Sequence, residues 1–260
     1  MKKVLITGVN SGIGSALFKE LYKRDNIEII GTYRNKETLP EYSLSCRCQF
    51  YKVDFSSSDQ IERWLAQTNF SRFDTIFFIH GTLEPIGRLA DIDYSLWHHS
   101  FQINYLSIVN VLNRTLKRLK IGCKIITLAG GGVNNAPDCF NAYISAKIAL
   151  IKMTELLAAE YPRQLFFNLG PGWVDTPIHK QTLVAGEKAP KAFEETKRRY
   201  KNKEFVSMQF VTNALLFLMD KADNSFSGRN FSVASGELKD LNLSNILKND
   251  PEKFKLRRHH

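Results

Sequence analysis

A tyrosine and a lysine stand four residues apart in the stretch Tyr143-Ile144-Ser145-Ala146-Lys147. On a helix this spacing places both side chains on one face. A phenol with its ordinary pKa of about 10 is a poor acid or base at neutral pH. A neighbouring ammonium favours the phenolate, so we expect Lys147 to lower the pKa of Tyr143 and prepare it for proton transfer. The alternative is a solvated surface pair, which is common on helices.

A glycine-rich turn near the N-terminus predicts a phosphate-binding site. The apolar run Val4–Ile6 indicates a buried strand, and glycines follow at positions 8, 12 and 14 before a helical pattern over Ser15–Tyr22. Glycine lets the backbone approach a pyrophosphate, and the helix N-terminus offers free N–H donors. The spacing Gly-x-x-x-Gly-x-Gly differs from the commoner Gly-x-Gly-x-x-Gly. A tight turn without a ligand is the other interpretation.

Strand and helix patterns alternate along the chain, which predicts an α/β fold with a parallel sheet and helices on both faces. The expected strands are Val4–Ile6, Ile27–Tyr33, Cys48–Val53, Asp74–His80, Lys124–Ala129, Gln164–Leu169 and Gly228–Val233. The expected helices are Ser15–Tyr22, Asp59–Asn69 (capped by Ser57 or Ser58), Ser95–Leu119, Phe140–Tyr161 and Gln209–Met219. The stretch 176–206 is polar and poorly periodic, and the segment after Gly236 resembles a surface tail.

Composition restricts the classes of protein to consider. The 260 residues fit one large domain over 1–236, followed by a basic tail over 237–260. Neither a membrane-spanning run nor a signal stretch is visible, and four cysteines without metal spacing indicate free thiols in a reducing cytoplasm. The net charge of +10 favours an anionic partner, but no nucleic-acid-binding motif accompanies it.

Candidate site residues follow the expected strands one after another. Ligands of such sheets bind beyond the carboxyl ends of the strands, so residues directly after strands should meet there. The glycine turn Gly8–Gly14 follows the first strand, and the later strands are followed by Arg34, Asp54, His80-Gly81, Gly130 and Pro171-Gly172. This convergence predicts one ligand site at that edge.

The ordered set of motifs resembles the short-chain dehydrogenase/reductase family over residues 1 to 235. The set consists of Thr7-Gly8-x-x-x-Gly12-x-Gly14, Asn104, Tyr143-x-x-x-Lys147 and Pro171-Gly172-x-Val174-x-Thr176. The resemblance implies a Rossmann fold with about seven parallel strands, NAD(P)(H) as cofactor, and hydride transfer between nicotinamide and a carbonyl or alcohol. It also implies a homodimer or homotetramer, because the long helices from Ser95 and Phe140 pair across subunits in this family.

The same resemblance implies a role for each matching residue. Tyr143 is the proton donor or acceptor, Lys147 tunes it and holds the nicotinamide ribose, and Asn104 supports a water that relays protons through Lys147. The residues expected to bind the cofactor are Gly8, Asn10, Ser11, Gly12, Ile13, Gly14, Arg34, Asp54, Gly81, Tyr143, Lys147, Pro171, Gly172, Val174 and Thr176. Among these, Asp54 would meet the adenine and Thr176 the carboxamide end.

The stretch after the second strand bears on the choice between NADP(H) and NAD(H). An acidic residue there would bond the adenine ribose hydroxyls and repel a 2′-phosphate. The sequence reads Thr32-Tyr33-Arg34-Asn35-Lys36, without an acid, and Arg34 can bind a phosphate in bidentate fashion. We therefore expect NADP(H) to be preferred, unless Arg34 is merely solvated.

One family position departs from the pattern. The family places a serine 13 or 14 residues before the tyrosine, where it hydrogen-bonds the substrate oxygen, but here Ala129 and Gly130 occupy those positions. Losing such a donor typically costs on the order of 10²–10³ in rate. Three interpretations remain: another group substitutes, with Asn134, Asn135 or Ser145 as candidates; the enzyme works slowly on an unusual substrate; or the protein binds the cofactor without turnover, as a sensor or partner subunit.

The histidines and a basic segment are two further features of the sequence. His80 stands where the family has alanine, and we expect it to be a packing residue rather than a catalyst. His98 and His99 are adjacent on a helix and point different ways, so we predict no metal site. The family's mobile substrate lid corresponds to 176–206, and its basic residues predict an anionic substrate such as a sugar phosphate, a nucleotide sugar or an acyl carrier, unless the charges are simply solvated.

Overall fold

The protein folds around one parallel sheet. The structure, a computed structural model, describes residues 1–35 and 46–257. Within these residues the strands lie in the order β3-β2-β1-β4-β5-β6-β7, and every pairing is parallel. Their bounds are β1 Lys2–Thr7, β2 Ile27–Tyr33, β3 Cys48–Lys52, β4 Thr75–Phe78, β5 Lys124–Leu128, β6 Leu165–Gly170 and β7 Arg229–Ser232. The predicted Rossmann-type fold is confirmed.

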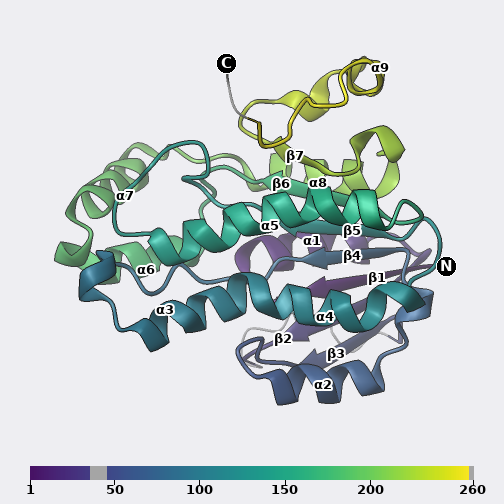
Figure 1. Ribbon diagram of the computed structural model, residues 1–260, viewed down its shortest axis with the longest axis horizontal. Helices are drawn as coiled ribbons and strands as arrows, with labels where there is room; N and C mark the ends of the chain where they lie inside the picture. The colour runs from purple at the N-terminus through teal and green to yellow at the C-terminus, as the bar shows by residue number, and fades with distance from the viewer. Residues whose placement is uncertain (36–45, 258–260) are drawn as a thin grey trace.

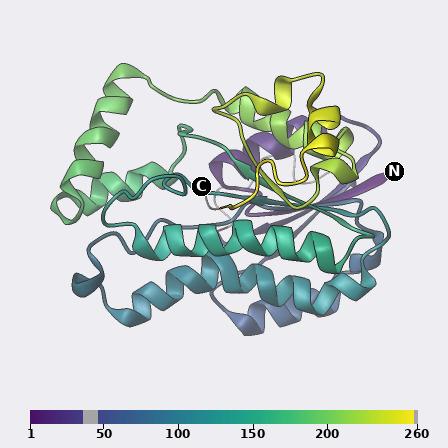
Figure 2. The same cartoon turned by 45° about the horizontal axis from the view of Figure 1, so that its top comes forward.

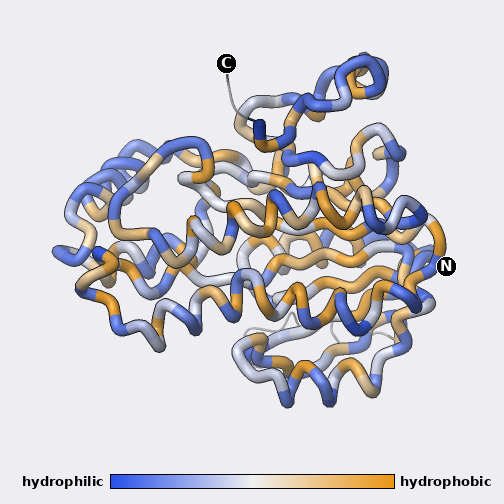
Figure 3. Tube along the Cα trace, viewed as in Figure 1, coloured by the Kyte–Doolittle hydropathy of each residue, from blue (hydrophilic) through white to orange (hydrophobic). Residues whose placement is uncertain are grey.

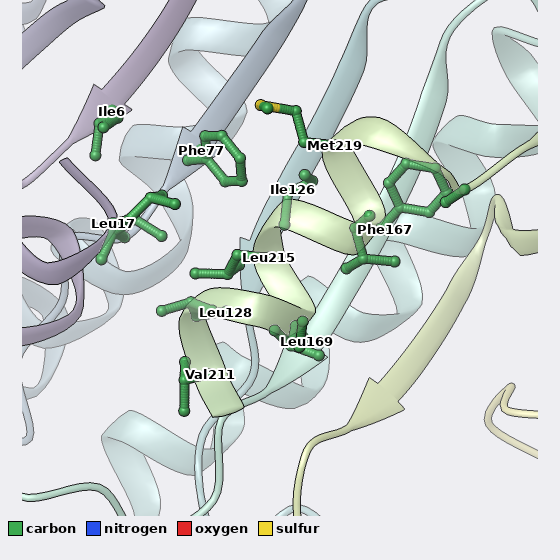
Figure 4. Packing of buried hydrophobic residues seen from close by; sticks show 14 of the residues in the cluster. Ile6, Leu17, Phe77, Ile126, Leu128, Phe167, Leu169, Val211, Leu215 and Met219 are labelled. Atoms are coloured by element: carbon green, nitrogen blue, oxygen red, sulfur yellow. The ribbon is translucent and has the colours of Figure 1, made fainter. Parts of the chain in front are cut away.

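Helices cover both faces of this sheet (Figure 1). One face packs against α1 (Gly12–Tyr22) and α8 (Met208–Asp220), whose side chains meet those of the strands in Figure 4. The other face packs against α2 (Ser58–Gln67), α4 (Ser107–Thr115) and α5 (Asn141–Glu160). Two separate apolar clusters thus sandwich the sheet, which is why the strands in Figure 3 are hydrophobic along most of their length.

The alternation of side chains along β1 shows how sequence produces these two layers. Val4 and Ile6 belong to the cluster under α1 and α8, whereas Leu5 between them belongs to the cluster under α2, α4 and α5. Successive side chains of a strand point to opposite faces, so a strand covered on both sides must be apolar throughout. All three residues are fully buried.

The long helix predicted over Ser95–Leu119 is interrupted at its centre. α3 (Tyr94–Phe101) passes into a π-helical turn, Gln102–Leu106, before α4 begins. A π-turn is rare and often occurs at a functional site, because it changes the direction of side chains and backbone groups. Asn104 lies within this turn and is completely buried.

Residues 176–206 form two helices, which the sequence analysis did not predict for this polar stretch. α6 (Ile178–Ala185) and α7 (Pro190–Asn202) lie beyond the carboxyl ends of the strands, at the left of Figure 1. We call residues 176–206 the lid. In Figure 3 much of this stretch is hydrophilic.

The segment after Gly236 packs against the sheet instead of extending away from it. Its helix α9 (Leu243–Asn249), drawn in yellow in Figure 2, packs against residues 224–226 and buries Leu243 and Leu247 in the cluster under α8. The Arg229 guanidinium of β7 donates hydrogen bonds to the carbonyl oxygens of Leu247 and Asp250. The predicted surface tail is therefore wrong for the residues up to 257. No helix in the described ranges is both long and apolar enough to cross a bilayer.

Candidate active site

The glycine turn between β1 and α1 is packed closely against other parts of the chain. Gly8 has φ +68°, in the left-handed region that glycine tolerates best. A Cβ on Gly14 would lie 2.1 Å from the carbonyl oxygen of Gly8, so only glycine permits this turn. Ser11 caps α1 by accepting a hydrogen bond from the Gly14 amide. The helix thus begins beneath the turn, with its positive end directed at the carboxyl edge of the sheet.

A cavity of about 980 Å³ opens at this carboxyl edge. Almost all residues predicted to bind the cofactor line it: Gly8, Asn10, Ser11, Gly12, Ile13, Arg34, Asp54, Gly81, Tyr143, Lys147, Pro171, Gly172, Val174 and Thr176. Gly14 lies beneath the turn and does not line the cavity. Open α/β sheets bind their ligands at this edge.

The far end of the glycine turn contacts the loop after β6. A Cβ on Gly12 would lie 2.7 Å from Cγ2 of Thr176, which shows how closely the two loops approach. Val174 is buried in the core, whereas Gly172 has φ +76° and turns the chain toward the lid. The two predicted halves of the cofactor site therefore belong to one cavity, although they are far apart in the sequence.

Arg34 and Asp54 line the same cavity at the ends of neighbouring strands β2 and β3. Arg34 is exposed, and Lys36 lies outside the described residues. Burial raises the pKa of Asp54, but hydrogen bonds from Ser56 and the charges of Arg34 and His99 outweigh that effect, so its pKa is lowered overall. Asp54 is thus a carboxylate at neutral pH and accepts hydrogen bonds from the amide and hydroxyl of Ser56.

Tyr143 and Lys147 lie in the first two turns of α5, and both are almost completely buried. Lys147 Nζ lies 5.7 Å from the centroid of the Tyr143 ring. Burial raises the pKa of Tyr143 and lowers the pKa of Lys147 to about 8. The expected lowering of the phenol pKa is therefore wrong for the protein alone, because desolvation favours the neutral form of both groups.

Asn104 supports the loop that follows β4. Its amide nitrogen donates to the carbonyl oxygen of Thr82 at 2.9 Å, and its Oδ1 accepts from the Thr82 amide at 3.1 Å. Between β4 and Thr82, a Cβ on Gly81 would lie 2.8 Å from Asn104 Oδ1 and 3.7 Å from Lys147 Nζ. Asn104 and Lys147 therefore meet at Gly81, and the π-turn is what directs Asn104 there.

His80 is a packed histidine within the site. Its Nδ1 lies 2.7 Å from the hydroxyl of Thr7 and its Nε2 lies 3.0 Å from the hydroxyl of Ser107. The ring stacks on Phe55 with a centroid separation of 3.8 Å. Burial and the charge of Lys147 lower the pKa of His80 to about 3, so the ring is neutral at pH 7. The sequence-based interpretation of His80 as a packing residue is confirmed.

The position of the missing serine is filled by Tyr143 itself. A Cβ on Gly130 would lie 2.4 Å from the hydroxyl oxygen of Tyr143. Of the proposed substitutes for the serine, Asn135 lines the cavity on an exposed loop, whereas Asn134 and Ser145 do not line it.

Sequence reasoning missed several residues of the lid that also line the cavity, among them Gln181, Thr182 and Thr196. All three belong to α6 or α7, which the polar stretch 176–206 did not predict. The helical spacing of positions 178, 182 and 185 was the available signal.

Comparison with known proteins places the chain in a family. Residues 8–237 match the family model described as Enoyl-(Acyl carrier protein) reductase. An uncharacterized oxidoreductase of Schizosaccharomyces pombe is 28% identical over 181 residues, covering 68% of this chain and 72% of that protein. Benzil reductase ((S)-benzoin forming) of Saccharomyces cerevisiae is 27% identical over 240 residues, which cover 85% of this chain and 90% of that protein.

Solved structures share the fold. A short-chain dehydrogenase/reductase of Saccharomyces cerevisiae has a TM-score of 0.80 at 20% identity, covering 92% of this chain and 98% of that one. A 4-hydroxyisoleucine dehydrogenase complexed with NADH has a TM-score of 0.74 at 21% identity, and the match covers 89% of this chain and 96% of that one. With the family match spanning most of its length, the chain belongs to the short-chain dehydrogenase/reductase family and is an NAD(P)-dependent oxidoreductase.

Proposed function

We propose that the protein is an NADP(H)-dependent oxidoreductase that interconverts a carbonyl and an alcohol, with Tyr143 as acid and base. The observation that carries this proposal is the meeting of Tyr143, Lys147 and the Asn104-supported loop on the cavity that the glycine turn also lines. The cofactor, when bound along this cavity, supplies or accepts the hydride. Gly8, the start of α1 and Thr176, all of which line the cavity, would hold it.

In this proposal, residues of the protein carry out the proton transfer. Tyr143 donates its hydroxyl proton to the substrate oxygen, and a raised pKa keeps that proton in place until negative charge develops. Lys147, with a pKa of about 8, exchanges protons near neutral pH and can reprotonate the phenolate. Asn104 holds the Thr82 loop against this pair and excludes bulk water from it.

Arg34 supports the preference for NADP(H). Its side chain is exposed at the cavity rim after β2, and Asn10 fixes the adjacent loop by donating to the carbonyl oxygen of Asn35 at 2.9 Å. A guanidinium in this position pairs with a 2′-phosphate, whereas a ribose hydroxyl gains little from it. We expect Arg34→Ala to weaken NADPH binding about 10- to 100-fold and to leave NADH binding unchanged. Arg163→Ala, at an exposed site outside the cavity, is the control.

The two lid cations that line the cavity, Lys191 and Arg199, are paired with carboxylates, which supports a neutral substrate over the anionic one that the composition predicted. Arg199 binds Glu195 at 2.7 Å, Arg198 binds Glu195 and Glu204, and Lys191 lies 3.3 Å from Asp138. Cations paired in this way attract an anion weakly. The name of the benzil reductase relative is consistent with a neutral carbonyl substrate.

A cofactor-binding protein with little turnover is the second candidate, and Gly130 is the observation that favours it. The backbone at Gly130 supplies no side-chain donor to a substrate oxygen. Following NADPH absorbance with a panel of ketones and aldehydes separates the two candidates. We expect turnover that Tyr143→Phe reduces by about 10²-fold or more. Tight NADPH binding without turnover of any carbonyl would instead support the binding protein.

We also propose a homo-oligomer assembled through the face formed by α3, α4 and α5. Leu96 on α3 and Leu156 on α5 are large apolar side chains that are half exposed in one copy of the chain. Burial of such side chains between subunits would be favourable. Size-exclusion chromatography with light scattering tests this, and Leu156→Glu is expected to shift the protein toward monomer.

A further inference from the structure

Helix α6 turns one face toward the reacting groups. Ile178, Thr182 and Ala185 are spaced by four and three residues and so share that face. Ile178 and Ala185 pack against a cluster that contains Tyr143 and Leu83. Thr182 lies between them along the helix, is 3% exposed and lines the cavity. Its hydroxyl is therefore the polar group of an otherwise apolar wall.

Helix α7 repeats the arrangement. Ala192, Thr196 and Arg199 are again spaced by four and three residues, and all three line the cavity. Ala192 packs against the same cluster as Tyr143, and Thr196 is 3% exposed. The two lid helices thus each present one buried threonine to the cavity, and the helices pack against each other.

These two threonines differ from other buried helical threonines of the chain. Thr115 and Thr154 donate to the carbonyl oxygens four residues earlier, at 2.7 and 2.9 Å, as threonine commonly does in helices. The hydroxyls of Thr182 and Thr196 make no hydrogen bond to any described residue of the protein. Neither hydroxyl is among the fully buried side-chain atoms that lack a partner in the described residues, so both are open to the cavity and free to hydrogen-bond a ligand there.

The charges around this pair are already neutralised by other groups. The Arg199 guanidinium lies 5.1 Å from the centroid of the Trp173 ring and binds Glu195. His179 stacks on the same Trp173 ring, and burial lowers its pKa to about 4, so it is neutral. The wall around the two hydroxyls is therefore apolar or electrically balanced, which suits a neutral oxygen better than a charged group.

We propose that the substrate carries a second neutral oxygen, a carbonyl or hydroxyl, which Thr182 and Thr196 bind while the reacting carbonyl faces Tyr143. This inference rests on the proposed oxidoreductase function and names its substrate class as diketones or hydroxyketones with a mainly apolar frame. The second oxygen accepts a hydrogen bond from each threonine and is chemically unchanged. Reduction occurs only at the first carbonyl, which gains the hydride on carbon and the Tyr143 proton on oxygen.

The test compares Thr182→Val and Thr196→Val, alone and together, with wild type. Valine keeps the shape of threonine and removes the hydroxyl. The substrates are 2-hexanone and its diketone analogues 2,3-hexanedione and 2,5-hexanedione, followed by NADPH absorbance. We expect wild type to prefer a diketone, and each valine variant to lose about 3- to 10-fold in kcat/KM on that diketone alone. Thr212→Val, a buried α8 threonine outside the cavity, is the matched control.

A binding measurement separates this inference from the proposed function. The preferred diketone should raise the melting temperature of the NADPH-loaded wild type and protect the double valine variant less. Equal losses on monoketone and diketone, or no loss on either, would overturn the role of the two threonines while leaving the oxidoreductase in place. Protection by the diketone without NADPH oxidation would contradict the proposed reaction and still support the threonine site.

Discussion

The hydroxyl oxygen of Tyr143 occupies the space that a side chain at Gly130 would need. A Cβ built on Gly130 would lie 2.4 Å from that oxygen and 2.6 Å from Cζ of the ring. Tyr143 is buried against Leu83 and Cys139, so the ring has little freedom to withdraw. With the phenol in this position, residue 130 has no room for the serine side chain that the family carries there.

Restoring the serine should consequently impair the protein. We expect Gly130→Ser to lower kcat by about tenfold or more, because the new Cβ displaces the phenol from its position. Gly130→Ala is the control, since it adds the Cβ without the hydroxyl and should cause a similar loss. Steady-state kinetics with NADPH and the best carbonyl measure both. A Gly130→Ser variant that is faster than wild type would show that the missing donor matters more than the space.

The buried ammonium of Lys147 should lower the free energy of unfolding of the protein. Its pKa of about 8 lies below the ordinary 10.5, so the folded state disfavours the charged ammonium. The penalty is complete below pH 8, decreases as the pH rises from 8 to 10.5, and is absent above that, so this group makes the protein more stable with rising pH. We expect Lys147→Met to raise the free energy of unfolding at pH 7 by on the order of 3 kcal/mol and to abolish turnover.

Urea unfolding of the cofactor-free protein at pH 7 and pH 10 measures this effect. The difference between Lys147→Met and wild type should shrink toward the higher pH. Lys152→Met, on the exposed side of α5, provides a matched change of charge. A Lys147→Met variant that is less stable than wild type at pH 7 would mean that contacts of the ammonium outweigh its desolvation.

Gln181 connects the lid to the catalytic loop. Its Oε1 accepts hydrogen bonds from the Leu83 amide at 2.8 Å and from the Thr82 hydroxyl at 3.4 Å, directly beside the residues that Asn104 supports. We expect Gln181→Leu to raise KM several-fold and to speed proteolytic cleavage within 176–206, because α6 loses its attachment. Gln209→Leu on α8 is the control. Unchanged cleavage would mean that apolar packing alone holds the lid.

Arg229 should be essential for the C-terminal segment. Its guanidinium donates to the carbonyl oxygens of Ser225, Leu247, Asp250 and Lys253. Removing it leaves buried carbonyl groups without donors, so we expect Arg229→Ala to lower the free energy of unfolding by about 2–4 kcal/mol. Arg229→Lys should recover only part of this, since one ammonium cannot reach four acceptors. Urea titrations measure the free energy of unfolding of both variants. An Arg229→Ala variant as stable as wild type would contradict the proposed role of Arg229 in holding the C-terminal segment.

Local patterns were sufficient for much of this protein. The apolar strands, the glycine turn, the Ser57 cap of α2 and the Tyr143–Lys147 pair on one helix depend on residues close together in sequence. Parallel strands bring the residues after their carboxyl ends to one edge, so the alternation also predicted that Gly8, Arg34 and Pro171 line one cavity. Spacing and side-chain type carry such information directly.

The behaviour of the reacting groups, by contrast, depends on long-range packing. The raised pKa of Tyr143, the neutral state of His80 and the paired charges of the lid require burial and partners distant in the chain. The same holds for α9, whose Leu243 and Leu247 are buried by packing into the apolar cluster between the sheet and α8. Sequence spacing determines which side chains share a face. The tertiary structure determines which other groups that face contacts and how much water remains around it.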